Sequence, residues 1–193
     1  MDLSRESSRP EKFSVGIDPG SQHVGLSLFE DESLVNFRRV SSYAGKNSAQ
    51  RVVALSKKVD IALTDMLGYA AQVAPIDCYI ELPGMQTKGR AGGLITLGMG
   101  VGAMTLLASN RGFNLHFSTV SEWSRLAGGV CRSKEDRAVV LENFFPTYRS
   151  SDDNGLDISD AIGIVAWNLG LFKDRKKEIE RLIGKRSKRA AGR

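Results

Sequence analysis

The stretch Val15-Gly16-Ile17-Asp18-Pro19-Gly20-Ser21 decides the fold, because it joins an apolar strand to a tight turn and places a carboxylate at the junction. The apolar residues on either side predict two strands joined through Pro19-Gly20, the second running over Val24 to Phe29. Asp18 therefore ends a buried strand, where a charge is costly unless a cation compensates it. Two interpretations stay open for this fragment: Asp18 caps the turn, or it holds a metal ion.

The composition is that of an ordinary globular protein. With 193 residues, 41% hydrophobic and 25% charged, the chain is long enough for one domain with a full core. We expect no apolar run long enough to cross a bilayer and no signal peptide, and hence a cytoplasmic protein. Cys78 and Cys131 form neither a disulfide framework nor a zinc motif, which favours free thiols in a reducing compartment.

Charge is distributed unevenly along the chain. Residues 173–193 contain ten Lys or Arg and three Asp or Glu, so this tail has a net charge of +7, while the rest of the chain is slightly acidic at −2. A basic arm on a near-neutral domain is typical of proteins that contact phosphate backbones, although a solubilising terminus would have the same composition. We therefore divide the chain into a flexible leader (1–12), a domain (13–172) and a basic tail (173–193).

The remaining pattern predicts an α/β domain. A third strand follows at 34–40, then a helix at 49–74 with Ser48 as its cap, a buried strand at 76–80 and a glycine-rich helix at 91–110. A strand at 113–117, a short helix at 119–123 capped by Ser121 and two helices at 133–145 and 156–170 complete the domain. Short connections make the first three strands antiparallel, and helical crossovers make the later strands parallel, giving a mixed five-stranded sheet flanked by helices.

Three further carboxylates resemble Asp18 in their setting. Glu81 ends the strand at 76–80, and Asp157 and Asp160 share one face at the start of the apolar helix at 156–170. The sequence places no basic residue directly beside them. A helix N-terminus stabilises one acid by about 0.3–1 kcal/mol, which does not account for two. Oxygen-only ligands of this kind suit Mg²⁺ or Mn²⁺, and two such ions support phosphodiester hydrolysis.

Gly16-Ile17-Asp18-Pro19-Gly20-Ser21, Ile80-Glu81 and Asp157-Ile158-Ser159-Asp160-Ala161 together resemble the RuvC family of Holliday junction resolvases, phage or viral members included. The resemblance runs from about Phe13 to Phe172. It implies a ribonuclease H-like fold, two Mg²⁺ or Mn²⁺ ions per site, and a homodimer formed through the helix at 89–108. It also implies a crossover junction endodeoxyribonuclease acting in DNA recombination and repair, at the nucleoid or a viral replication site, with a branch-migration motor or replication proteins as further partners.

Carried over by motif, the resemblance makes Asp18, Glu81, Asp157 and Asp160 the metal-binding acids, and Lys134 a catalytic lysine near the scissile phosphate. Basic residues in the loops and in the helix at 133–145 are expected to bind DNA: Lys88, Arg90, Arg125, Arg132, Lys134 and Arg137. The chain departs from the family where an aromatic wedge is usual, since Gly84 stands there. A second family lysine also has no clear equivalent, and Arg125 is its nearest substitute.

Other functions remain open on the sequence. A broader nuclease for branched DNA, which cuts flaps and replication forks, would use the same acids. A non-cleaving architectural protein on the same fold would not need all four. A YqgF-like ribonuclease is less consistent with Ile80-Glu81 and the helix that follows it. Junction, flap, duplex and RNA substrates compared side by side would separate these functions.

Overall fold

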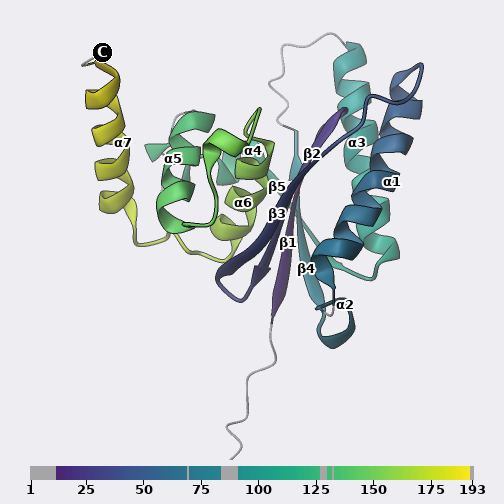
Figure 1. Cartoon of the computed structure of the whole chain (residues 1–193), viewed down its shortest axis with the longest axis horizontal. Helices are drawn as coiled ribbons and strands as arrows, with labels where there is room; N and C mark the ends of the chain where they lie inside the picture. Colours follow the sequence, from purple (N-terminus) through teal and green to yellow (C-terminus); the bar gives the residue numbers. More distant parts are fainter. Residues whose placement is uncertain (1–11, 69, 84–90, 127–129, 132, 192–193) are drawn as a thin grey trace, which may run out of the picture.

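A five-stranded mixed sheet forms the centre of the molecule (Figure 1). In this computed structural model, residues 12–68, 70–83, 91–126, 130–131 and 133–191 are described. The strands are β1 (Phe13–Pro19), β2 (His23–Glu30), β3 (Ser33–Ser41), β4 (Ile76–Leu82) and β5 (Asn114–Thr119). They are arranged in the order β3-β2-β1-β4-β5. β1 to β3 pair antiparallel, whereas β4 and β5 are parallel to β1, which confirms the predicted sheet.

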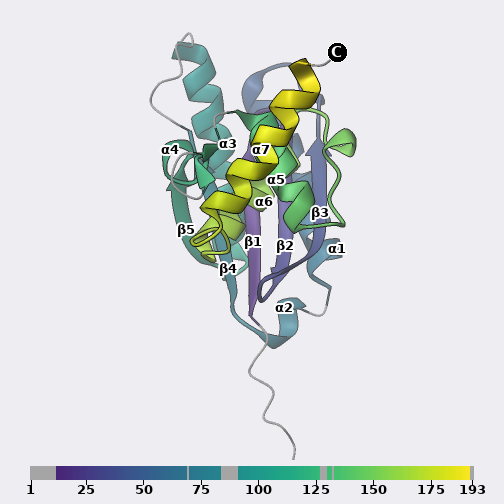
Figure 2. The same ribbon diagram turned by 90° about the vertical axis from the view of Figure 1, so that its left-hand side faces the viewer.

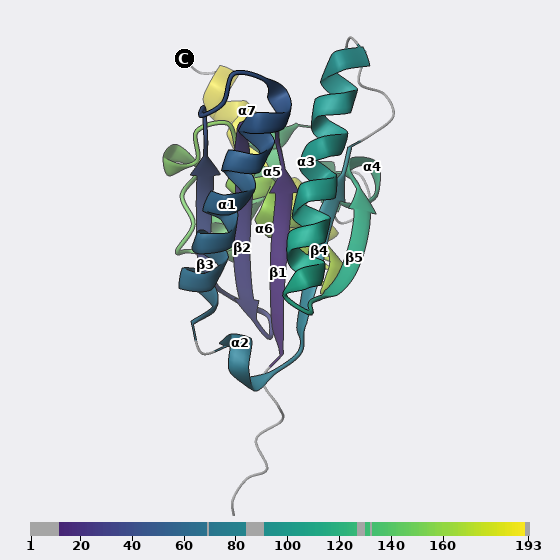
Figure 3. The same ribbon diagram turned by 90° about the vertical axis from the view of Figure 1, so that its right-hand side faces the viewer.

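Helices cover both faces of this sheet. α1 (Ser48–Leu67) and α3 (Ala91–Asn110) lie against one face (Figure 3), and the short α2 (Ala70–Val73) leads into β4. On the other face lie α4 (Val120–Trp123), α5 (Lys134–Phe144) and α6 (Asp157–Asn168), with the 3-10 turn η2 (Ser150–Asp152) between α5 and α6. α7 (Lys176–Ala191) forms an outer layer beyond α5 (Figure 2).

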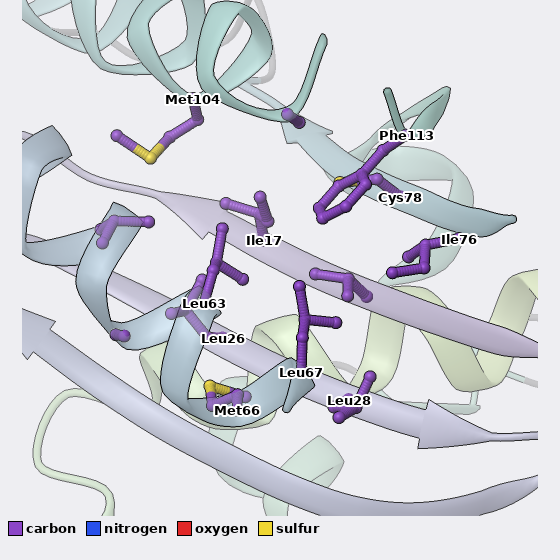
Figure 4. Close-up of a cluster of buried hydrophobic side chains, with 14 of the residues drawn as sticks. Ile17, Leu26, Leu28, Leu63, Met66, Leu67, Ile76, Cys78, Met104 and Phe113 are labelled. Atoms are coloured by element: carbon purple, nitrogen blue, oxygen red, sulfur yellow. The ribbon is translucent and has the colours of Figure 1, made fainter. Parts of the chain in front are cut away.

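The first core fills the space between the sheet and the α1/α3 layer (Figure 4). Alternate residues of the strands point into it, because successive side chains of a strand face opposite sides of a sheet. Ile17, Leu26 and Ile80 are fully buried there, and Leu63 and Met104 meet them from the two helices. This alternation sends Asp18 and Glu81 to the opposite face, toward α6.

The second core lies under α6, which is buried along most of its length. α6 packs across β1 and β2, and the hydroxyl of Ser27 on β2 donates to the carbonyl oxygen of Ala161 at 2.8 Å. Ile162 and Val165 of α6 join Trp123 and Tyr148 in this core. The first turn of α6 is thereby held against the sheet.

Several element boundaries differ from those predicted. The helix expected over 49–74 ends at Leu67, since Gly68 at φ 48° terminates α1, and α2 is separate. Its cap is Asn47, whose side chain accepts from the Gln50 N–H, and not Ser48. α4 is capped by Thr119 with Glu122 in a capping box, and not by Ser121. The tail, for which we predicted no structure, forms α7, and Ile179 buries α7 against α5.

α3 is more apolar than expected and also more exposed. Over Gly93–Asn110 its mean hydropathy is 1.3, while 17% of this segment is buried. The expectation that no apolar run is long enough to cross a bilayer is therefore wrong on length and composition, and among the described residues α3 is the single helix of this kind. Three large apolar side chains stand at its surface: Leu94, Ile95 and Leu106.

Candidate active site

Asp18 and Glu81 come from two neighbouring parallel strands. Ile17 of β1 is in register with Ile80 of β4, so the acids that follow them lie at the same end of the sheet. The apolar residues before each acid fix it in the core, and the alternation of the strands turns both carboxylates toward α6. The structure thus brings together the two strand-end acids that the sequence singled out.

The first turn of α6 supplies Asp157 and Asp160. Asp160 is buried and Asp157 is half-buried. Leu156, just before the helix, has a left-handed conformation (φ 59°) and makes no side-chain cap. The buried Asp153 takes that role, since its carboxylate accepts from the N–H groups of Ile158 (3.1 Å) and Ser159 (2.8 Å). The Tyr148 hydroxyl donates to the same carboxylate at 3.0 Å, which fixes the cap.

Burial and the neighbouring acids raise the pKa of Asp18 and of Glu81. For Asp18, burial raises the pKa well above its usual range, and the negative charges of Glu81, Asp160 and Asp157 raise it further, while Lys134 lowers it. For Glu81, burial and the charge of Asp160 raise the pKa to about 7, against the opposing effect of Lys134 and Arg137. Asp18 and Glu81 have no cation in direct contact among the described ion pairs, so their charge is compensated poorly.

Asp157 and Asp160, in contrast, have cationic partners far away in sequence. Arg39 of β3 donates through Nε to Asp157 at 2.7 Å. Asp160 receives Lys134 Nζ at 2.5 Å and the Arg137 guanidinium at 2.9 Å. Burial alone would lower the pKa of Lys134, but Asp160 and the other acids raise it above its usual value. The sequence has no basic residue beside these two acids, but the fold brings Arg39, Lys134 and Arg137 to them.

The residues present fit a divalent cation. Among the described residues, Oε2 of Glu81 and Nε1 of Trp123 are both buried without a hydrogen-bond partner, although the indole N–H is near enough to lower the pKa of Glu81. A buried carboxylate oxygen without a partner, beside the similarly buried Asp18, is the oxygen chemistry that Mg²⁺ and Mn²⁺ bind. Within the described part of the chain, no three acidic, His or Cys side chains stand close enough together to form a complete metal site, and Asp157 and Asp160 are paired with cationic side chains.

The residues predicted to contact DNA differ in exposure, and some of them lie outside the described part of the chain. Lys88, Arg90 and Arg132 lie outside the described residues, as does Gly84. Arg125 is exposed, and Lys134 is half-exposed with its ammonium group at Asp160. Arg137 is 6% exposed and its guanidinium faces Asp160, which disagrees with the predicted DNA contact.

The sequence did not assign three residues to this site that the structure places there: Arg39, Trp123 and Asp153. Strand alternation was a usable signal for Arg39, because the buried Val40 beside it faces the α1/α3 core. No comparable signal marks Trp123, which reads as an ordinary core residue, or Asp153, which lies in a polar loop.

No protein-family model matches the chain, and neither does any curated protein. Among solved structures, T. thermophilus RuvC in complex with a Holliday junction substrate aligns at a TM-score of 0.63 and 17% identity, over 86% of this chain and 96% of RuvC. A second Thermus thermophilus RuvC structure aligns at 0.58 with the same identity and coverage. Similarity at this identity establishes the fold: the chain has the ribonuclease H-like fold of RuvC, as its motifs predicted.

Proposed function

We propose that this protein is a metal-dependent, structure-selective DNA endonuclease that resolves four-way junctions by paired nicks. One observation carries the proposal: Asp18 and Glu81, adjacent on parallel strands, face Asp157 and Asp160 at the start of α6, beside the Lys134 ammonium. The fold shared with RuvC, solved with a Holliday junction substrate, supports the choice of branched DNA.

The four acids would hold Mg²⁺ or Mn²⁺, of which we propose two per site. Such ions lower the pKa of a bound water and neutralise charge on the attacking and leaving oxygens. Among the described residues no cation contacts Asp18 or Glu81, so these two acids would be stabilised most by a bound metal ion. Lys134, protonated and half-exposed beside Asp160, would stabilise the charge that develops on the scissile phosphate.

Basic residues around the site would bind the phosphate backbone. Exposed Arg125 follows α4, and we keep the loop residues Lys88, Arg90 and Arg132 as proposed contacts. The basic tail would add a further contact, because α7 rises in Figure 1 toward the end of the sheet at which β1 ends. The enzyme would act in the cytoplasm, at a nucleoid or viral replication site, in recombination and repair.

We further propose a homodimer formed through α3. Paired nicks on a two-fold symmetric junction need two sites related by symmetry. The exposed apolar face of α3 supports this assembly, since a large apolar surface on a helix ordinarily has a partner.

The deciding experiment is cleavage of a labelled four-way junction by the purified protein, in Mg²⁺ and in Mn²⁺, beside flap, linear duplex and RNA substrates. We expect symmetric paired nicks in the junction and little cutting elsewhere. Asp18→Asn should abolish cleavage and retain junction binding, whereas Asp31→Asn, in the exposed β2–β3 turn, should cut normally.

Other outcomes separate the alternatives. Flaps cut as readily as junctions would replace the resolvase with a broader branched-DNA nuclease on the same site. Binding without cutting in either ion would replace it with an architectural junction-binding protein. Unchanged nicking by Asp18→Asn would overturn the assignment of the acids.

A further inference from the structure

A buried arginine lies behind the candidate active site. Arg137 on α5 is 6% exposed, and one of its terminal nitrogens donates to Oδ1 of Asp160 at 2.9 Å. Its guanidinium carbon stands 5.0 Å from the ring centroid of Trp123, within the range of a cation–π interaction. Burying a guanidinium is unfavourable unless it is paired, so this position is built around the contact with Asp160.

Trp123 is fixed in turn by α6. It is fully buried, and the ring leans on Gly163, where a side chain would collide: a Cβ there would lie 2.6 Å from the ring. Among the described residues its N–H has no hydrogen-bond partner, yet it lowers the pKa of the Glu81 carboxyl. The buried Oε2 of Glu81 likewise has no partner among these residues. Arg137, stacked on Trp123, therefore contacts Asp160 directly, and Trp123 lowers the pKa of Glu81.

Resting on the nuclease function proposed above, we propose that Arg137 is a positioning residue: backed by Trp123, it holds the Asp160 carboxylate in the orientation that binds the divalent cation. It does not contact DNA. Arg137 differs in this from Lys134, which reaches the same carboxylate from a half-exposed position and is free to meet a phosphate.

Three roles for Arg137 predict different results. A positioning residue raises affinity for the cation, because partners that orient metal ligands typically contribute about 10- to 100-fold. If Arg137 only compensates the charge of Asp160, it lowers the affinity for the divalent cation, because a positive charge beside a metal ligand repels the ion. A DNA contact leaves metal affinity alone and contributes about one unit to the salt dependence of DNA binding.

The test uses Arg137→Met, which removes donor and charge, and Arg137→Gln, which keeps an N–H donor without the charge. Arg38→Met is the matched control, because Arg38 forms an exposed ion pair with Asp65. For each folded protein, calorimetry measures Mn²⁺ affinity without DNA. Junction binding is measured across salt concentrations in EDTA, and the cleavage rate under single-turnover conditions.

We expect Arg137→Met to weaken Mn²⁺ binding about 10- to 100-fold and to slow cleavage at least as much, with junction affinity and salt slope unchanged. Arg137→Gln should retain more Mn²⁺ affinity than Arg137→Met, and Arg38→Met should match the wild type. Should Arg137→Met fail to fold, Arg137→Gln carries the comparison alone.

Tighter or unchanged Mn²⁺ binding in both variants would overturn the proposal, and so would a salt slope reduced by about one unit. The two proposals fail separately. If the wild type binds Mn²⁺ but cuts no branched DNA, the nuclease function fails while the Mn²⁺ comparison still decides the role of Arg137. If the wild type cuts and Arg137→Met loses neither affinity nor rate, the positioning role alone fails.

Discussion

Asp77 is the centre of a second charged cluster, at the start of β4 and so at the opposite end of that strand from Glu81. Its carboxylate receives Lys12 Nζ at 3.0 Å, His116 Nε2 at 3.2 Å and Asn114 Nδ2 at 3.3 Å. The His116 ring stacks on Tyr79, with ring centroids 4.8 Å apart. These contacts join β4 to the edge strand β5 and to the residue that precedes β1.

This cluster predicts a pH-dependent contribution to stability. Burial raises the pKa of Asp77, but the hydrogen bonds from Lys12, His116 and Asn114 outweigh it, so the net pKa lies below the ordinary value. A carboxylate with a lowered pKa in the folded state stabilises the fold above the unfolded pKa of about 4, and this stabilisation is lost as pH falls through the lower folded value.

Asp77→Asn should therefore reduce the free energy of unfolding by about 0.2–1 kcal/mol at pH 7, because Lys12 is exposed and surface pairs contribute little. The difference from wild type should shrink below about pH 4. Urea unfolding at pH 7, 5 and 3 measures it. A difference that stays constant over this range would show that the ionised carboxylate is not what stabilises the cluster.

At the same scale, the sequence singled out the acids that the structure brings together, but it did not show their partners. Asp18 and Glu81 follow local apolar runs, and Asp157 and Asp160 share a helical face, so local periodicity finds them. Arg39 reaches Asp157 across 118 residues, and no local pattern contains that contact. Arg137 was predicted as a DNA contact, and arginine is mostly exposed; only the packing of α5 against α6 shows that this side chain is buried.

At the scale of elements, α6 depends on a cap that the sequence did not suggest. Asp153 belongs to no regular element, yet it binds two N–H groups of the first turn of α6 and the hydroxyl of Tyr148. The acids Asp157 and Asp160 belong to the turn that this cap holds. Element types were predicted better than their ends, because caps such as Asn47 and Thr119 are decided by geometry among several polar candidates.

Asp153→Ala should lower the free energy of unfolding by roughly 1–3 kcal/mol, because it leaves buried donors without a partner. It should also slow junction cleavage, since the first turn of α6 carries two of the acids. Asp152→Ala is the matched control: Asp152 is the exposed neighbouring residue and should be close to neutral. Chemical denaturation of both variants decides the matter, and equal losses would refute a specific cap.

α7 shows a second limit of the sequence at this scale. The density of Lys and Arg in 173–193 hid an amphipathic repeat in which Ile179 and Ile183 face the second core. The first part of α7 therefore packs on the domain through Ile179 and Ile183. Removal of the tail as a whole would expose core residues as well as remove charge.

At the scale of the whole molecule, the apolar face of α3 has no partner within the described chain. Ile95 is 64% exposed and Leu106 is 62% exposed, and their spacing of 11 residues places them on one side of the helix. Gly98 and Gly102 lie between them with open space around each, so a second helix could approach closely. Either a membrane or a second copy of the chain could bury the apolar face of such a helix.

The second copy is favoured because β1, β4 and β5 pack under the opposite side of α3, which leaves a single apolar face rather than a helix that is apolar all round and free of the domain. Ile95→Glu should then convert a homodimer to a monomer in analytical ultracentrifugation. Ile61→Glu on α1, at a residue of similar exposure (63%), should leave the dimer intact.

Cleavage gives the second measurement of this prediction. A monomer retains all four acids of its own site, so Ile95→Glu should still nick a junction but lose the simultaneous paired cuts, which a supercoiled cruciform plasmid reports as nicked circles in place of linear product. A wild type that sediments as a monomer would contradict the assembly, and sedimentation with lipid vesicles in that case would identify the membrane as the cover of α3.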